Sequence, residues 1–233
     1  MPNAEYETVT PADVLGPLNE VESKSAPERL YLLGDRALLR FGPRVSIVGS
    51  RKASPDGLQR ARKLAASLAE HQITVVSGLA AGIDRAAHLG AIEARGRTIA
   101  VLGTPLDQFY PKDNKALQEE IGRDHLLVSQ FPPGYPAMPK NFPMRNHTMA
   151  LITDATVIVE AGEQSGTLHQ GWEALRLGRL LFLLESVAEN PNLSWPSKMI
   201  EYGAQVLSRS NLDAVIENLP ALTDDLGGIA LEA

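Results

Sequence analysis

Short apolar runs alternate with stretches of helical character along most of this chain, and several of the runs stop at a glycine. The runs expected to form strands cover residues 44–48, 73–77, 98–102, 126–129, 156–160 and 180–184. Their residues do not alternate between apolar and polar, which is typical of parallel strands covered by helices on both sides. The sequence therefore predicts an α/β fold, an extended Rossmann-like, doubly wound and mostly parallel sheet with helices on both faces.

The charges are unevenly distributed along the 233 residues, whose net charge is −6. Ten of the 28 acidic residues lie within 1–22 and 213–233, which contain no lysine or arginine. The rest is mildly basic, with 22 basic and 18 acidic residues, and this fits a phosphate-rich ligand. We expect a partly irregular N-terminal lead-in (1–43), a Rossmann-like DNA- or nucleotide-binding domain (44–219) and an acidic C-terminal tail (220–233).

Several classes of activity lack their sequence signatures. The chain has no cysteine, which excludes disulfides and thiolate metal sites, and its five histidines are dispersed. The glycine-rich motifs of nicotinamide enzymes and nucleoside triphosphatases are absent, as is the Gly-x-Ser-x-Gly turn of many hydrolases. We therefore predict no catalytic residue, no metal and no cofactor. No apolar run approaches the ~20 residues of a membrane span, so we expect no membrane contact and a cytoplasmic location.

The turn after the first run carries groups that bind anions. It comprises Gly49, Ser50, Arg51 and Lys52, and Ser54 follows as the expected N-cap of a helix. Free backbone N–H groups at a helix N-terminus beside two cations favour phosphate. The alternative interpretation is an ordinary turn with two solvated bases.

A second candidate phosphate site opens a later helix. Ser165, Gly166 and Thr167 follow the fifth run, and small hydroxyl residues at a helix N-terminus either bind phosphate or simply cap the helix. Gly78 ends the second run at the same edge of the sheet, because the carboxyl ends of parallel strands lie together. We include these four residues in the predicted site.

A proline-rich loop over 131–143 introduces a third group of residues, Lys140, Phe142, Arg145 and Asn146. Cations interleaved with an aromatic ring suit single-stranded nucleic acid, because the cations contact phosphates and the ring stacks on a base. The alternative is that Phe142 fills the core beneath the loop.

Asp84 and His88 are four residues apart and therefore share one face of an expected helix. They could act as an acid and a base. The favoured interpretation is structural, with the aspartate near the helix start and the histidine held by a partner.

Taken together, these motifs resemble the DNA-processing protein A (DprA, also called Smf) family over about residues 44–207. The segments that carry the resemblance are Val48-Gly49-Ser50-Arg51, Val76-Ser77-Gly78-Leu79-Ala80-Ala81-Gly82-Ile83-Asp84, His88, Ala100-Val101-Leu102-Gly103, Tyr110-Pro111, Ser129-Gln130-Phe131-Pro132-Pro133-Gly134, Phe142-Pro143-Met144-Arg145-Asn146-His147, Val159-Glu160-Ala161 and Ser165-Gly166-Thr167.

The resemblance implies an extended Rossmann fold that binds single-stranded DNA and hands it to the RecA recombinase. It also implies a role in recombination and natural transformation, and a homodimer. Carried over to the matching motifs, it places phosphate on Arg51 and Lys140, a base on Phe142, and Arg145 and Asn146 in the same pocket.

The chain departs from the family pattern at several positions. His147 replaces the third residue of the usual Arg-Asn-Arg, and Gln130 replaces a glutamate. His169-Gln170-Gly171-Trp172 is bulkier and more polar than the family's residues, and Glu185-Ser186 replaces a Pro-Gly. We also expect the N-terminal helical and C-terminal winged-helix domains of many members to be missing or vestigial.

Two functional hypotheses follow. The first is a non-enzymatic protein of the DprA type that binds single-stranded DNA. The second is an enzyme or sensor for a small nucleotide, since residues 162–167 followed by Glu173 loosely resemble the phosphate-binding turn and glutamate of phosphoribohydrolases. A purely structural dimer has no positive sequence signal.

Overall fold

The computed structural model describes residues 5–219, and in them nine strands form one sheet. The strands are β1 (Glu7–Val9), β2 (Leu30–Gly34), β3 (Arg44–Gly49), β4 (Thr74–Ser77), β5 (Thr98–Leu102), β6 (Leu126–Ser129), β7 (Ala155–Glu160), β8 (Leu180–Leu184) and β9 (Gln205–Leu207). The helices are α1 (Pro11–Leu15), α2 (Glu20–Ser23), α3 (Pro55–Glu70), α4 (Ile83–Glu93), α5 (Lys115–Asp124), α6 (Asn141–Leu151), α7 (Thr167–Arg176), α8 (Glu185–Ala188) and α9 (Trp195–Glu201). Short 3-10 helices η1 (Arg36–Leu39) and η2 (Lys112–Asn114) and a helical stretch over 212–219 complete the description.

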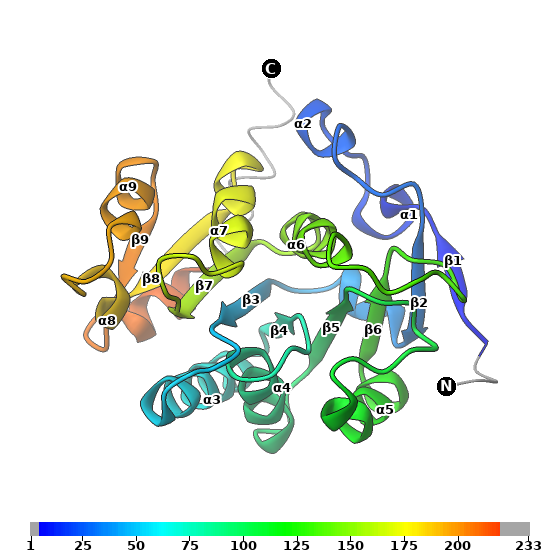
Figure 1. Cartoon of the computed structure of the whole chain (residues 1–233), viewed down its shortest axis with the longest axis horizontal. Coiled ribbons are helices and arrows are strands. Elements are labelled where there is room, and N and C mark those ends of the chain that lie inside the picture. Colours follow the sequence, from blue (N-terminus) through cyan, green and yellow to red (C-terminus); the bar gives the residue numbers. More distant parts are fainter. Residues whose placement is uncertain (1–4, 220–233) are drawn as a thin grey trace.

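The strand order is β1-β2-β6-β5-β4-β3-β7-β8-β9 (Figure 1). All neighbours from β6 to β9 are parallel, whereas β1 and β2 are antiparallel additions at one edge. The chain builds outward from β3 in two directions, through β4 to β6 on one side and through β7 to β9 on the other. This arrangement confirms the predicted Rossmann-like, mostly parallel fold, and it places the topological switch point between β3 and β7.

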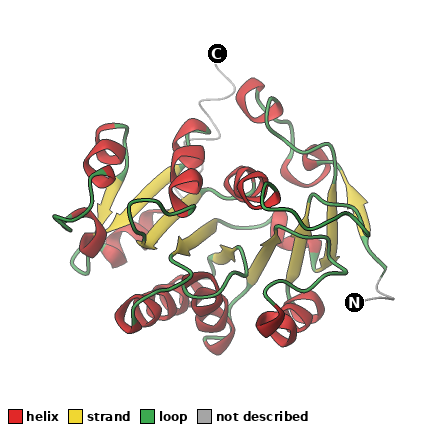
Figure 2. Ribbon diagram, in the orientation of Figure 1, coloured by secondary structure: helices red, strands yellow, loops and turns green. Residues whose placement is uncertain are grey.

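Helices cover both faces of the sheet (Figure 2), and the central strands are apolar on both faces. Ile47 and Val75 belong to the core on the side of α3 and α4, while the next residues, Val48 and Val76, belong to the opposite core. Successive side chains of a strand point to opposite faces, so a strand between two helical layers needs an unbroken apolar run.

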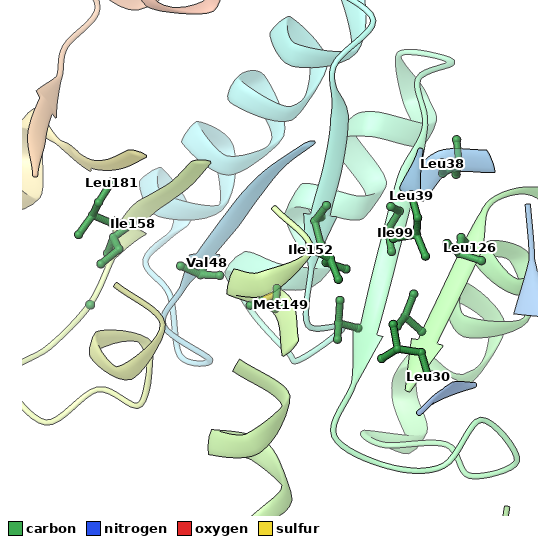
Figure 3. Packing of buried hydrophobic residues seen from close by; sticks show 14 of the residues in the cluster. Leu30, Leu38, Leu39, Val48, Ile99, Leu126, Met149, Ile152, Ile158 and Leu181 are labelled. Atoms are coloured by element: carbon green, nitrogen blue, oxygen red, sulfur yellow. The ribbon is translucent and has the colours of Figure 1, made fainter. Parts of the chain in front are cut away.

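On the face of the sheet opposite α3 and α4, helix α6 contributes much of the apolar packing. Figure 3 shows Met149 and Ile152 in the same cluster as Val48, Ile99 and Leu126 of the sheet. All five side chains are at most 4% exposed, so this packing fixes the position of α6 against the sheet.

Helix α6 begins earlier than predicted. The sequence predicted a proline-rich loop as far as residue 143, whereas the observed helix starts at Asn141. Pro143 lies in the first turn, where its missing N–H would have no helical partner in any case. Phe142 is therefore on a helix and not on a loop.

Residues before 26 show little apolar periodicity, yet the structure has a strand and two short helices there. Both helices have capping boxes, formed by Thr10 with Asp13 and by Asn19 with Glu22. These caps are local hydrogen bonds of polar side chains, which apolar periodicity does not detect. The domain boundary at residue 44 stays a prediction, although β1 and β2 belong to the same sheet as the later strands. The predicted tail over 220–233 lies outside the described residues.

His88 lies fully buried on α4, and its partner is Thr98, as the structural interpretation of the Asp84–His88 pair required. Its Nδ1 is 2.7 Å from Thr98 Oγ1, whose hydroxyl donates to the carbonyl of Val75 at 2.9 Å. Thr98 therefore accepts the Nδ1 proton, and Nε2, which is buried without a protein partner, is left unprotonated. Burial, with smaller effects from His125 and Arg145, lowers the pKa of His88 to about 3.

This histidine is expected to make the protein less stable in mild acid. The unfolded chain binds the His88 proton below about pH 6.5, while the folded protein does not bind it until about pH 3, so stability falls as the pH drops between these values. From pH 7 to pH 5 the loss from His88 is about 2 kcal/mol.

The measurement is urea unfolding at both pH values for the parent, His88→Met and His169→Gln. The parent and His169→Gln, which changes an exposed histidine, should lose about 2 kcal/mol more than His88→Met does. The same loss in all three proteins would show that His88 does not cause it.

Candidate nucleic-acid interface

The predicted site residues gather where β3 and β7 end, at the switch point of the sheet. The turn after β3, the loop between β7 and α7, and the first turns of α6 line a pocket of about 540 Å³. Open parallel sheets bind ligands at this position, because the loops on either side diverge there. Most of the predicted residues line the pocket, namely Gly49, Ser50, Arg51, Phe142, Arg145, Asn146, Ser165, Gly166 and Thr167.

The turn after β3 is held on both sides by backbone contacts. The Ser50 N–H donates to the carbonyl of Glu160 at 2.7 Å, and the Ser50 carbonyl accepts from the N–H of Ile83 at 3.2 Å. A Cβ at Gly49 would lie 2.6 Å from Ile83 Cγ1 and 2.8 Å from the Glu160 oxygen, so glycine permits this close approach. The clamped backbone leaves the Arg51 side chain exposed at the pocket.

The N-terminus of α3 already holds a carboxylate of the protein itself. Glu160 accepts the Ser54 N–H at 2.9 Å and the Ser54 hydroxyl at 2.5 Å, and Ser54 Oγ accepts the Gly57 N–H at 3.0 Å. The sequence predicted a phosphate at this helix start, but the carboxylate of Glu160 takes that place in the protein itself. Ser54 is thus placed away from the pocket lining and against Glu160.

Phe142 contacts both Arg51 and Tyr110 at the pocket rim. The guanidinium carbon of Arg51 lies 5.2 Å from the centroid of the Phe142 ring, a cation–π distance. The ring centroids of Tyr110 and Phe142 are also 5.2 Å apart, with the planes tilted by 47°. Phe142 is half-buried and rests on Gly103, where a Cβ would approach the ring to 2.7 Å.

Arg145 is buried in the wall of the pocket and is only 5% exposed. Its guanidinium donates to the carbonyls of Gly78 at 2.5 Å and Val101 at 2.8 Å, and its Nε donates to Asn146 at 3.0 Å. Gly78 leaves room for this group, since a Cβ there would overlap the guanidinium. Arg145 and Gly78 therefore build the end of the sheet and do not belong to the exposed rim.

The buried Arg145 is electrostatically linked to Asp84, which accepts the N–H of Ala80 at 3.3 Å. Burial lowers the pKa of Arg145, and the charge of Asp84 opposes this effect. Burial likewise raises the pKa of Asp84, and the charge of Arg145 opposes it. Each charge thus makes the burial of the other less costly.

The start of α7 forms another part of the pocket lining. The N-cap of α7 is Gly166, and the preceding Ser165 Oγ accepts the N–H of Thr167 at 3.2 Å, within the turn that leads into the helix. The Asn146 amide donates to the carbonyl of Gly166 at 3.3 Å, which joins α6 to the α7 start. The predicted residues 165–167 therefore lie next to Arg51 and Phe142 in one pocket.

Lys52 and Lys140 are exposed and lie outside the pocket lining. Lys52 follows Arg51 in the turn, and Lys140 directly precedes α6. Both lysines are thus next in sequence to elements that do line the pocket.

His147, which departs from the family pattern, contacts Glu173 of α7. Its Nδ1 is 2.9 Å from Glu173 Oε1, and Arg176 binds the same carboxylate. Burial by itself would raise the pKa of Glu173, but the hydrogen bonds from Arg176 and His147 outweigh it and lower the pKa. Glu173 is therefore an ionised, fully engaged structural carboxylate and not a poised acid.

The predicted site residues did not include two contributors, Glu160 and Tyr110, although the segments that carry the family resemblance contain both. Glu160 ends an apolar strand with a charge, which is a signal for a polar role at the sheet edge. Tyr110 is one of only five tyrosines and follows the third strand by eight residues. Within residues 5–219, no three histidine, aspartate or glutamate side chains are clustered as metal ligands. Over the same residues, no helix combines the length and the apolar character needed to cross a membrane.

The chain was compared with known protein families, sequences and structures. A profile of the DNA recombination-mediator protein A family matches residues 7–220. The DNA processing protein DprA of Streptococcus pneumoniae is 39% identical over 196 residues, 84% of this chain and 68% of that protein. DprA of Bacillus subtilis is 32% identical over 83% of this chain and 65% of its own length. The chain thus spans about two thirds of these relatives.

A solved structure gives the same result. The DNA processing protein A of Helicobacter pylori, a protein that binds single-stranded DNA, superimposes with a TM-score of 0.77 and 27% identity. The match covers 95% of this chain and 98% of that one. The sequence profile, the identities and the shared fold agree, and the chain belongs to the DNA recombination-mediator protein A family.

Proposed function

We propose that this protein binds single-stranded DNA in DNA processing and recombination, and that it acts by binding and not as an enzyme. The observation that carries the proposal is the Arg51 guanidinium lying 5.2 Å over the Phe142 ring in a pocket that the start of α7 also lines. Such a site combines a phosphate-binding cation and an aromatic ring with the hydroxyl side chains of Ser165 and Thr167.

In this proposal the DNA phosphates lie along Arg51, Lys52 and Lys140 and at the α7 start, and a base enters the pocket beside Phe142. Both lysines are exposed and free to follow a flexible strand. The named H. pylori relative binds single-stranded DNA, which supports the same ligand here. Loading of RecA, a role in natural transformation and a homodimer are further parts of the proposal, and they rest on family membership.

The pocket volume also favours a second candidate ligand. About 540 Å³ is enough space for a mononucleotide, the ligand of the small-nucleotide hypothesis. The glutamate assigned to that hypothesis, Glu173, is held by Arg176 and His147, which weakens the case for hydrolysis.

The test is fluorescence anisotropy of a labelled oligo-dT across a salt series, with AMP as a competitor. Three phosphate contacts predict a slope of log K against log salt of about −2, since single strands give about −0.7 per contact. AMP should not displace the oligonucleotide. The proposal fails if oligo-dT does not bind while AMP raises the thermal stability, which would instead support the small-nucleotide function.

A further inference from the structure

Phe142 separates two pockets at the rim of the site. One is the pocket of about 540 Å³, and the other, of about 140 Å³, is lined by Gly103, Thr104 and Tyr110. Arg51, Phe142 and Arg145 line both. The rim therefore offers two adjacent cavities that share one ring and one exposed cation.

The Phe142 ring is already packed by protein groups. Arg51 lies over it at 5.2 Å, Tyr110 packs at a ring distance of 5.2 Å, and Gly103 lies close to its edge. Tyr110, in contrast, is 49% exposed. Large aromatic side chains normally bury most of their surface, so an exposed ring that flanks a pocket indicates a binding role.

The loop that carries Tyr110 is well anchored. Gln108 donates to the carbonyl of Tyr135 at 2.9 Å, and Gln118 donates to the carbonyl of Gln108 at 3.0 Å. Asn114 donates to the carbonyl of Leu79 at 2.8 Å. Anchors on both sides hold Tyr110 in place before any ligand arrives, which lowers the entropy cost of stacking.

We infer that Tyr110 is a base-stacking residue and that Phe142 is the platform behind it. The inference rests on the proposed function and adds a second nucleotide position, in which Tyr110 stacks on the base next to the one in the larger pocket. Every base has a flat π face, so this contact recognises a single strand without selecting its sequence. Arg51, which lines both pockets, contacts the phosphate between the two nucleotides.

The test compares Tyr110→Ala with the parent on oligo-dT and on an abasic oligonucleotide of equal length. We expect Tyr110→Ala to bind oligo-dT about tenfold more weakly, with the same salt slope, because stacking removes no phosphate contact. Both proteins should bind the abasic strand equally. Tyr110→Phe should bind like the parent, and Tyr110→Trp should show fluorescence quenching with oligo-dT but not with the abasic strand.

Phe41→Ala is the matched control. Phe41 is 69% exposed and precedes β3, so it lies at the opposite edge of the sheet from the pockets. Its replacement should leave both affinities unchanged. Should Tyr110→Ala be poorly folded, Tyr110→Leu replaces it and keeps an apolar side chain.

Equal binding of oligo-dT by the parent and Tyr110→Ala would overturn the inference, and so would an equal loss on the abasic strand. In both cases the parent still binds oligo-dT, and the proposed function stands. A parent that binds no oligonucleotide would instead overturn the proposed function and this inference with it.

Discussion

Arg145→Met is expected to lower the free energy of unfolding by about 3–5 kcal/mol, the cost of removing one partner from a buried charged network. The carbonyls of Gly78 and Val101 would lose their donor, and each such buried group costs about 1–3 kcal/mol. Asp84 would lose the charge that opposes its burial. Urea unfolding at neutral pH measures the change.

Arg85→Met is the matched control, because Arg85 is exposed on α4 next to Asp84 in the sequence. It should change the stability by less than about 0.5 kcal/mol. A value for Arg145→Met within about 1 kcal/mol of the parent would mean that the guanidinium does not support the sheet end.

Arg51→Ala is expected to weaken binding to oligo-dT by roughly tenfold to a hundredfold, the value of one charge-assisted phosphate contact. It should also make the salt slope shallower by about 0.7, because the variant makes one fewer phosphate contact and therefore releases fewer counterions from the strand. Folding should be unaffected, since the side chain is exposed. The salt series used for the parent measures both effects.

Arg123→Ala is the control for this substitution. Arg123 is exposed at the C-terminal end of α5, before β6, and therefore at the amino edge of the sheet. It should retain the affinity and the slope of the parent. An unchanged slope in Arg51→Ala would remove this residue from the phosphate contacts, whatever its effect on affinity.

The Glu160 carboxylate is bound at the N-terminus of α3, which leaves other groups of the site for a phosphate. In many Rossmann-like folds the helix after the first strand receives the ligand's phosphates. Here the Glu160 carboxylate binds Ser54 at that position, and Asp56 adds a second negative charge in the first turn. In the proposed complex we therefore expect the DNA phosphates at Arg51 and the α7 start and not at the start of α3. Glu163, in the loop that follows β7, makes a similar pair of contacts, since it accepts from the N–H and hydroxyl of Ser194 before α9.

Much of the fold was predictable because strands and helices have local periodicity. The apolar runs correctly placed β3 to β8, and Ser54 correctly marked the start of α3. The start of α6 was missed because Pro143 suggested a loop, whereas proline is tolerated in a first helical turn. The sequence correctly identified most of the residues that line the pocket. It did not reveal that Arg145 is buried in the pocket wall or that Ser54 binds Glu160.

The sequence by itself determined strands β3 to β8, the mostly parallel character of the sheet and the edge at which polar residues collect, because these follow from patterns among neighbouring residues. Only the tertiary structure decided that Arg145 is buried and that Glu160 binds Ser54, the N-cap of α3. It alone placed Tyr110 against Phe142, 32 residues away in the chain. The physical reason is that such contacts depend on how the strands are ordered and where their loops meet. A local sequence pattern carries no information about which residues far apart in the chain come together.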